Sequence, residues 1–504
     1  MIRLLLALLM VALPATAQER TPIAQDALSL PQLLRDEHVS PFWLHPPARF
    51  DNAARALEDV ATTGVDDETI AAAMLTLIAT IGDGHTVFAD RYTTFGIAPF
   101  FAEVYDDGLF LGRVPAAKKP LLGAEIVAVG GVPIADALSR LRGVVPHSTE
   151  NRFRRWVRSY LHLPGLVHVL GLSESADAIE LTLRLRSGEV VKETFGRLTV
   201  EAYDELEMAY LELPKTARTR HDDKRYWLEP IGDDALYVKI DRCASGDEES
   251  IWDFGRRMAA HVREHQTRRV ILDLRDNGGG GYQFVAHIRP LLHALPTLDH
   301  PGGVIVLTGK VTFSAACDLL AQVQRFTDAT LIGQTAGCSI GEPGDDDDFA
   351  LPKSGLTIRI SQIAGRDRAA IDRRRIFTPD VLIEERFTDL MAGLDPVLDA
   401  AVAFEPAADE PAEPASSWAG RYQLEPGIDL AIAQRDGRWR ATALPVLDTP
   451  LTALSPTRLT AAIPGLTFTL RDDTVHVARA DGTTLIAPPK ENDSPSAWEL
   501  VFAG

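Results

Sequence analysis

The sequence of 504 residues predicts an α/β protein, and three observations carry this prediction. Between residues 229 and 404, apolar β-branched runs alternate with amphipathic helical patterns, as they do in βαβ units with a buried, largely parallel sheet. Two of these runs end in conspicuous turns at the carboxyl ends of the predicted strands, where the binding and catalytic residues of such sheets gather. The flanking segments differ, being mainly helical before residue 92 and all-β after residue 418.

Composition restricts the class of partner. With 46% hydrophobic and 24% charged residues, the chain is globular. Its net charge of −20 argues against nucleic acid, whose phosphates need a basic surface, and against an anionic membrane surface. Of the three cysteines (Cys243, Cys317 and Cys338), one pair could form a disulfide and leave one over. Their spacing does not resemble a zinc site, and we expect neither metal nor cofactor.

The first 17 residues have the pattern of a secretory signal peptide. Arg3 supplies the positive charge, Leu4 to Leu13 the apolar core, and Ala15 to Ala17 the small-residue cleavage site. This run is too short to span a bilayer, and no later stretch approaches that length. We therefore expect a periplasmic or secreted protein without a membrane span.

The segments before residue 229 predict two units and a connection. In the helical region at 18–92, Asp66 is placed to cap a helix with an apolar stripe. Residues 93–170 contain a hairpin signal at Asp107-Gly108, followed by a strand, a turn at Gly130-Gly131 and a helix. Here the stretch GAEIVAVGG resembles the GDxIxxVNG stretch of PDZ-like modules, which bind extended peptides along a sheet edge. Residues 171–228 are expected to connect this module to the core and to contain a strand pair.

The core prediction consists of strands at 235–240, 269–275, 304–307 and 330–333, with helices near 249–265, 282–294 and 313–325. Asp395-Pro396 opens a last helix. A Pro/Ala/Glu linker at 405–417 leads to a C-terminal β domain at 418–504, with hairpins at Asp436-Gly437 and Asp481-Gly482.

The first conspicuous turn contains Ser314. The run from Val304 to Val323 passes from a strand through a short turn into a helix, and Ser314 falls in the first helical turn. A serine placed there can attack a carbonyl while nearby amides stabilise the oxyanion. The alternative is that Thr312 or Ser314 is an ordinary helix cap.

The second conspicuous turn is the glycine run Gly278 to Gly281, directly after the strand ending near Arg275. Consecutive glycines let the backbone approach a ligand and can form an anion-binding nest. The plainer interpretation is a flexible turn. The case for a dinucleotide-binding site is weaker still, because the GxGxxG motif is absent in its proper form.

Together these turns resemble motifs of the C-terminal-processing, or tail-specific, serine proteases. The resemblance is to the branch of this family that includes the tricorn core protease and the repeats of interphotoreceptor retinoid-binding protein. VxDLRxNxGG matches Val270 to Gly280, and TxSxA matches Thr312 to Ala316, with Cys317 where Glu is usual. A later PD…GxDxxL pattern matches residues 379–398. The resemblance implies a ClpP/crotonase-like core and the hydrolysis of peptide or protein substrates.

The resemblance also implies roles for residues. Ser314 would be the nucleophile, and the Ala315 amide with Gly279 or Gly280 the oxyanion hole. The lysine of many bacterial members is missing from 334–339, whereas Asp83-Gly84-His85-Thr86 resembles the element that carries the histidine base in the tricorn-like branch. His85 is therefore expected to be the base. Asp372 is expected to be the acid that orients it, with Glu342 as its competitor.

Alternatives remain at this point. The chain could be a non-catalytic ligand- or peptide-binding scaffold, or an esterase with the same machinery. Asp345 to Asp348 could bind calcium, although a solvated acidic loop is the simpler expectation. Four histidines on predicted helices are expected to be ordinary helix residues: His261, His265, His287 and His293.

Overall fold

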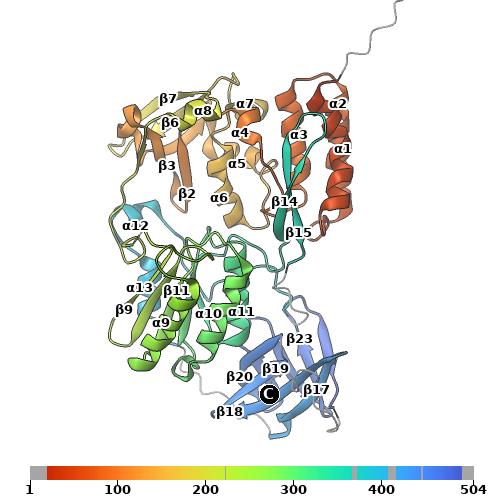
Figure 1. The fold of residues 1–504 in the computed structure, drawn as a ribbon, viewed down its shortest axis with the longest axis vertical. Coiled ribbons are helices and arrows are strands. Elements are labelled where there is room, and N and C mark those ends of the chain that lie inside the picture. Colours follow the sequence, from red (N-terminus) through yellow and green to blue (C-terminus); the bar gives the residue numbers. More distant parts are fainter. Residues whose placement is uncertain (1–19, 222, 366–371, 407–415, 444–445, 491–504) are drawn as a thin grey trace, which may run out of the picture.

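The computed structural model describes residues 20–221, 223–365, 372–406, 416–443 and 446–490 (Figure 1). The expected signal peptide and most of the expected linker lie outside these ranges. In the described chain, no helix combines the length and apolarity needed to cross a membrane. Figure 1 shows the N-terminal helices and a first sheet at one end, the core in the middle, and the C-terminal β domain at the other end.

The N-terminal region is helical, as predicted. Its main helices are α1 (Pro22–Glu37), α2 (Pro47–Thr62) and α3 (Asp67–Ala79). Asp66 caps α3, because its Oδ1 accepts a hydrogen bond from the Thr69 amide at 2.9 Å. The predicted apolar stripe is buried: Ile70, Met74, Leu77, Ile78 and Ile81. The chain leaves this region at Gly82, whose φ of +78° favours glycine, and then reaches His85.

An antiparallel sheet follows, with strand order β2-β3-β4-β6-β7. Its strands are β2 (Phe101–Tyr105), β3 (Gly108–Pro115), β4 (Glu125–Val129), β6 (Ala178–Arg184) and β7 (Val190–Gly196), with β5 (Val132–Pro133) on β4 and β8 (Met208–Tyr210) on β3. The hairpin at Asp107-Gly108 is confirmed. The turn at Gly130-Gly131 is also present, but it leads first into the short strand β5, which pairs with β4, and then into a helix. Because β6 and β7 belong to this sheet, the unit continues past the boundary expected at residue 170. Its PDZ-like character stays a prediction.

Short helices accompany this sheet. They are α4 (Arg91–Phe95), η1 (Ala116–Leu121), α5 (Ile134–Leu141), α6 (Glu150–Tyr160), α7 (Pro164–Val169) and α8 (Val200–Asp204). Helix α6 packs against β2 and points its N-terminal end toward the core, where the Asn151 side chain donates to the Thr335 carbonyl at 2.6 Å. The sheet unit is therefore joined to the core near the predicted site.

The core contains the predicted parallel sheet, in the order β16-β13-β12-β11-β10-β9. The strands are β9 (Tyr226–Ile231), β10 (Ala235–Ile240), β11 (Arg269–Asp273), β12 (Val304–Thr308), β13 (Thr330–Gly333) and β16 (Val381–Leu382). Only the β9–β10 pairing is antiparallel among these described strands. The four strands expected from apolar runs are confirmed.

Helices cover both faces of the core sheet, which explains why its strands are apolar throughout. The helices of the core are α9 (Ile251–Glu264), η2 (Tyr282–Phe284), α10 (Val285–His293), η3 (Pro296–Leu298), α11 (Ala315–Phe326), α12 (Phe387–Met391) and α13 (Pro396–Val402). Leu272 and Val306 pack on the side of α9, α10 and α11. Ile271 and Ile305 pack on the opposite side, against α13. Asp395 caps α13, as predicted.

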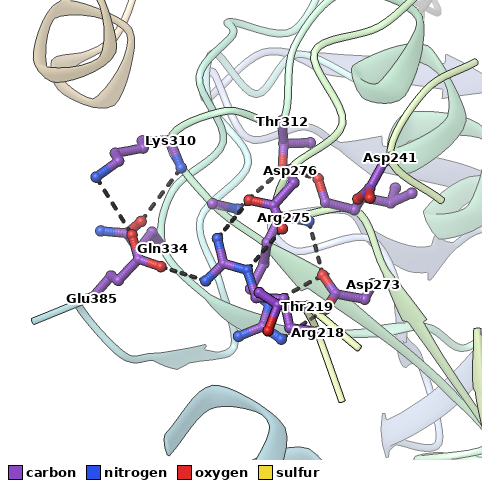
Figure 2. A network of polar contacts seen from close by, with 12 residues as sticks. Arg218, Thr219, Asp241, Asp273, Arg275, Asp276, Lys310, Thr312, Gln334 and Glu385 are labelled. Atoms are coloured by element: carbon purple, nitrogen blue, oxygen red, sulfur yellow. Dashed lines mark hydrogen bonds and ion pairs between the residues drawn. The ribbon is translucent and has the colours of Figure 1, made fainter. Parts of the chain in front are cut away.

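A network of ion pairs lies where β10, β11 and β12 end (Figure 2). Arg218 binds Asp276 through Nη2 and Oδ1 at 2.6 Å and also pairs with Glu385. Lys239 Nζ lies 2.9 Å from the other oxygen of Asp276. Burial alone would raise the pKa of Asp276, but Arg218 and Lys239 outweigh it and hold that pKa well below its usual range. This network anchors the chain directly before the glycine run.

Arg275, the neighbour of Asp276, is fixed in the same way. Its guanidinium lies 2.7 Å from Asp273 and 2.6 Å from Asp395, and all three side chains are largely buried. A buried charge that loses its partner is strongly destabilising. These ion pairs therefore hold the backbone of the DLRDN stretch in place directly before the glycine run.

A long hairpin connects the core to the N-terminal helices. Strands β14 (Gly344–Ala350) and β15 (Thr357–Ile363) run beside α1–α3 in Figure 1. There β15 pairs antiparallel with β1 (Val87–Phe88), two residues after His85. The Asp26 side chain on α1 accepts a hydrogen bond from the Ser354 amide at 2.6 Å. This pairing brings the histidine loop to the core.

The four aspartates at 345–348 lie on β14, so this acidic segment is a strand and not the expected loop; Asp345, Asp347 and Asp348 are exposed to solvent, as expected. Arg359 on the paired strand lies 3.0 Å from both Asp346 and Asp348. Within the described ranges, no three His, Cys, Asp or Glu side chains are grouped in a way that could hold a metal ion.

The C-terminal domain is all-β, as predicted, apart from the short η4 (Ser416–Trp418). Eight strands follow in sequence order: β17 (Gly420–Glu425), β18 (Ile428–Arg435), β19 (Arg438–Ala443), β20 (Leu447–Ser455), β21 (Arg458–Ala461), β22 (Thr467–Arg471), β23 (Thr474–Ala478) and β24 (Thr484–Ala487). A bridge between Tyr422 and Pro489 nearly closes them into a barrel. The domain is attached to the core through Arg438, which lies 2.6 Å from Asp328.

Candidate active site

Ser314 lies at the tight turn between β12 and α11, in a strained conformation with φ 55° and ψ −130°. Thr312 anchors this turn, because its hydroxyl donates to the Leu274 carbonyl at 2.8 Å and accepts from the Gly309 amide. The Ser314 side chain makes no capping hydrogen bond to the helix. The helix-cap interpretation of Ser314 is therefore wrong. Strain of this kind is typically stored at functional sites.

His85 is the hydrogen-bond partner of Ser314. Its Nε2 lies 3.1 Å from the serine Oγ, although 229 positions separate the two residues. The histidine loop is held by Asp83, whose buried carboxylate accepts from the amides of His85 and Thr86.

A second histidine supports Asp83 from behind. Asp83 Oδ2 lies 2.7 Å from Nε2 of His38, and both side chains are buried. The Ser40 amide donates to Nδ1 of His38, so the proton of a neutral His38 is on Nε2 and is donated to Asp83. The Asp83 carboxylate is thus committed to His38 and to the loop backbone.

The His85 ring lies in a dry, aromatic environment. It stacks on Phe313, and the guanidinium carbon of Arg152 lies 3.3 Å from the centroid of the same Phe313 ring. Burial lowers the pKa of His85 to about 4; the Asp83 carboxylate opposes this shift and Arg152 adds to it. The imidazole is therefore neutral near pH 7 and able to accept a proton.

The glycine run packs directly on the serine. A Cβ on Gly279 would lie 2.5 Å from the Cβ of Ser314, so only glycine fits there. The Gly279 amide already donates to the Asn277 side chain at 2.9 Å. In the described chain, the amides of Gly280 and Ala315 have no such acceptor, and both residues line the cavity at Ser314. Of the two predicted glycines, Gly280 is the one with an amide available to an oxyanion.

The structure does not bring Asp372 to the histidine. Its carboxylate binds Arg374, with Oδ2 2.8 Å from Nη2, and its described side-chain bonds all go to this one residue. Glu342 is closer to the site, but it holds the backbone beside His85 rather than the ring. Nδ1 of His85 is buried and has no well-formed hydrogen bond, but the backbone carbonyl of Pro343 lies against the ring and raises its pKa.

The cavity at Ser314 is narrow, with a volume of about 50 Å³. Cys317 and Cys338 line it and form a disulfide that joins the first turn of α11 to the segment after β13. Cys243 is free and buried. Burial raises the pKa of its thiol to about 12. Of the arrangements that the sequence left open, the structure has one bridged pair and one free cysteine.

Sequence reasoning missed three contributors to this site. Phe313 is adjacent to Ser314 and Asp83 belongs to the histidine motif, so proximity in sequence was the available signal for both. His38 carried no signal. The four helical histidines lie on or directly after α9 and α10, away from the residues lining the Ser314 cavity.

Comparison with known proteins gives a match in structure alone. No family model matches the sequence, and no curated protein matches it. A crystal structure of a CPAF mutant matches with a TM-score of 0.53 and 13% identity, covering 76% of this chain and 99% of that one. Mature CPAF complexed with lactacystin matches with a TM-score of 0.52 and 12% identity, covering 76% and 97%. The chain therefore has the fold of the CPAF structures, and at the level of fold this agrees with the resemblance drawn from its sequence motifs.

Proposed function

We propose that this chain is an extracytoplasmic serine peptidase in which Ser314 is the nucleophile and His85 the base. The observation that carries this proposal is the 3.1 Å contact between His85 Nε2 and Ser314 Oγ. A serine and a histidine brought together from two separate parts of the fold, at a strained turn beside a cavity, match the arrangement of an activated nucleophile.

The proposed reaction follows from this geometry. Ser314 Oγ attacks the substrate carbonyl while His85 Nε2 takes its proton. The amides of Gly280 and Ala315 stabilise the tetrahedral oxyanion, and His85 then protonates the leaving amine. Water, activated by the same histidine, releases the acyl group from Ser314.

The proposed base works without a carboxylate on its ring. Asp83 lies close enough to stabilise a protonated His85 by charge, as its opposing effect on the His85 pKa indicates. The described contacts of Asp372 do not support the role expected for it. The proposed site is thus a serine–histidine pair with Asp83 acting at a distance.

An esterase with the same machinery is the second candidate, because the 50 Å³ cavity admits a small acyl group. The non-catalytic scaffold is less consistent with the site, since a binding module gains nothing from a strained Ser314 hydrogen-bonded to His85. The location proposed for the protein, the periplasm or the exterior, rests on the N-terminal sequence pattern.

Labelling with a fluorophosphonate probe tests the proposal. We expect the wild type to label, and Ser314→Ala and His85→Ala to lose labelling. Ser187→Ala, in an exposed turn between β6 and β7, is the matched serine control and should label like the wild type. Labelling that survives Ser314→Ala would exclude this nucleophile. The ratio of kcat/KM for peptides and for small esters then separates peptidase from esterase.

A further inference from the structure

Glu342 lies where three parts of the chain meet. Its Oε1 accepts a hydrogen bond from the Gly84 amide at 2.7 Å, next to His85. Its Oε2 accepts from the Ser339 amide in the core at 2.9 Å and from the hydroxyl of Ser148, which precedes α6. One side chain thus joins the histidine loop, the sheet unit and the segment that follows the Cys338 disulfide.

The neighbouring contacts make this junction rigid. The carbonyl of Gly84 accepts from Arg152 at 3.1 Å, so both backbone polar groups of this residue are held by other parts of the chain. A Cβ on Gly84 would lie 2.5 Å from Arg152 and 2.9 Å from Phe313, which leaves no room for the loop to shift. Beside it, the Thr149 hydroxyl donates to the Ala336 carbonyl at 3.3 Å.

We infer that Glu342 is a positioning residue that holds His85 within reach of Ser314, and that it can do so only as a carboxylate. This inference rests on the proposed function. The Gly84 and Ser339 amides can only donate, and they point at different oxygens of Glu342, so both oxygens need to accept. The Ser148 hydroxyl is a further donor to one of these oxygens. A protonated Glu342, or a glutamine in its place, would itself carry a hydrogen-bond donor, and that donor would face one of these donating groups.

The surroundings make this requirement sensitive to pH. Burial raises the pKa of Glu342 to about 7, and the Ser148 hydroxyl and the Ser339 amide oppose that shift. The charged groups that face Glu342 are Asp83, which raises its pKa further, and Arg152 on α6, which carries the opposite charge. As the pH falls through about 7, Glu342 takes up a proton and the hold on Gly84 weakens.

The test is the pH profile of the rate at which a fluorophosphonate labels Ser314, measured from pH 5 to 9. We expect the wild-type rate to fall as the pH drops below about 7, well above the pKa of about 4 that governs His85 itself. Glu342→Gln should label about 10- to 100-fold more slowly at pH 8, which is the loss of rate expected when a base is displaced from its nucleophile. Its pH profile should show no step near pH 7. Ser148→Ala should move the step to higher pH, because its hydroxyl stabilises the ionised form.

Glu150→Gln is the matched control. Glu150 lies on the exposed start of α6, two residues from Ser148, and pairs with Arg142 at the surface. It should keep the wild-type rate and profile. Thermal unfolding of each variant, and Ser148→Ala as a milder change, guard against simple misfolding.

The outcomes separate the two proposals. A wild type that does not label defeats the proposed function. A wild type that labels, with a Glu342→Gln variant of unchanged rate, defeats the positioning role alone. A slow Glu342→Gln variant that keeps the step near pH 7, or a Ser148→Ala variant whose step does not move, defeats the requirement for a carboxylate.

Discussion

The imidazole of His85 stacks on the ring of Phe313, with centroids 4.5 Å apart and 28° between the planes. Phe313 immediately precedes Ser314, so the turn that presents the proposed nucleophile also restricts the plane of the proposed base. No acidic side chain is hydrogen-bonded to Nδ1 of His85 among the described residues. Stacking on Phe313 therefore constrains the orientation of this histidine, together with the backbone carbonyl of Pro343.

Phe313→Leu should lower kcat about tenfold with little change in KM. The stacked pair is worth about 0.5–1.5 kcal/mol, and without it the imidazole can rotate away from Ser314 Oγ. Steady-state kinetics on a peptide substrate and the labelling rate of Ser314 measure this effect. Phe326→Leu, at the buried far end of α11, is the control and should lower stability but not kcat. A Phe313→Leu enzyme with unchanged kcat would remove the orienting role.

Ser314→Gly should be more stable than Ser314→Ala by about 1 kcal/mol, although both are expected to be inactive. A non-glycine residue in a sparsely populated conformation costs about 1–3 kcal/mol, and the lost chain entropy of glycine offsets part of that gain. Denaturant unfolding of the two variants isolates the strain, because both lack the hydroxyl. Equal stability would mean that the positive φ of 55° is not strained in solution.

The glycine run offers three neighbouring positions with different expected outcomes. A Cβ on Gly280 would lie 2.3 Å from the Cys243 carbonyl, and one on Gly279 2.5 Å from Ser314, whereas one on Gly278 meets no atom within 4 Å. Gly279→Ala would displace Ser314, and Gly280→Ala would displace the amide proposed for the oxyanion hole. Each should therefore lower kcat by about 100-fold or more, an effect as large as the loss of one oxyanion donor. Gly278→Ala should stay close to wild type. A uniform effect at all three positions would argue for a flexible turn instead.

The sequence predicted the core and most of the candidate site because both depend on local patterns. Runs such as Val304 to Leu307 are apolar throughout because helices cover both faces of their sheet, and this pattern is readable without a structure. Ser314, His85 and the glycines were found because the motifs around them are short and contiguous.

Strand pairings and side-chain contacts between residues far apart in the chain could not be predicted from the sequence. The partner of β1 is β15, about 270 residues later, and that pairing is what carries His85 to the core. Asp372 was selected by its position relative to a motif, but Arg374, two residues away, satisfies its carboxylate. The role inferred for Glu342 depends on Gly84 and Ser148, which no local pattern connects to it.

Removing the Cys317–Cys338 disulfide should lower the free energy of unfolding by about 3 kcal/mol, as expected for a bridge that closes a loop of 21 residues. Cys317→Ala combined with Cys338→Ala, compared with wild type in denaturant with and without reductant, measures this loss. Cys243→Ala is the control: its thiol is free, so that variant should keep the full response to reductant. A wild type that does not respond to reductant would contradict the bridge.

His162 should make the protein sensitive to acid. Its ring is buried among Tyr92, Phe100 and Phe101, and burial lowers its pKa to about 3, with Arg91 adding to the shift. The unfolded chain takes up this proton near the ordinary pKa of 6.5, whereas the folded chain resists until about 3. The resulting stability is complete above pH 6.5 and is lost as the pH falls toward 3, by up to about 1.4 kcal/mol per pH unit. Denaturant unfolding between pH 7 and 4 should therefore show a shallower decline for His162→Leu than for wild type. His168→Leu, an exposed change on α7, is the control and should keep the wild-type slope. Equal slopes for all three proteins would show that His162 takes up its proton as readily in the folded chain as in the unfolded chain.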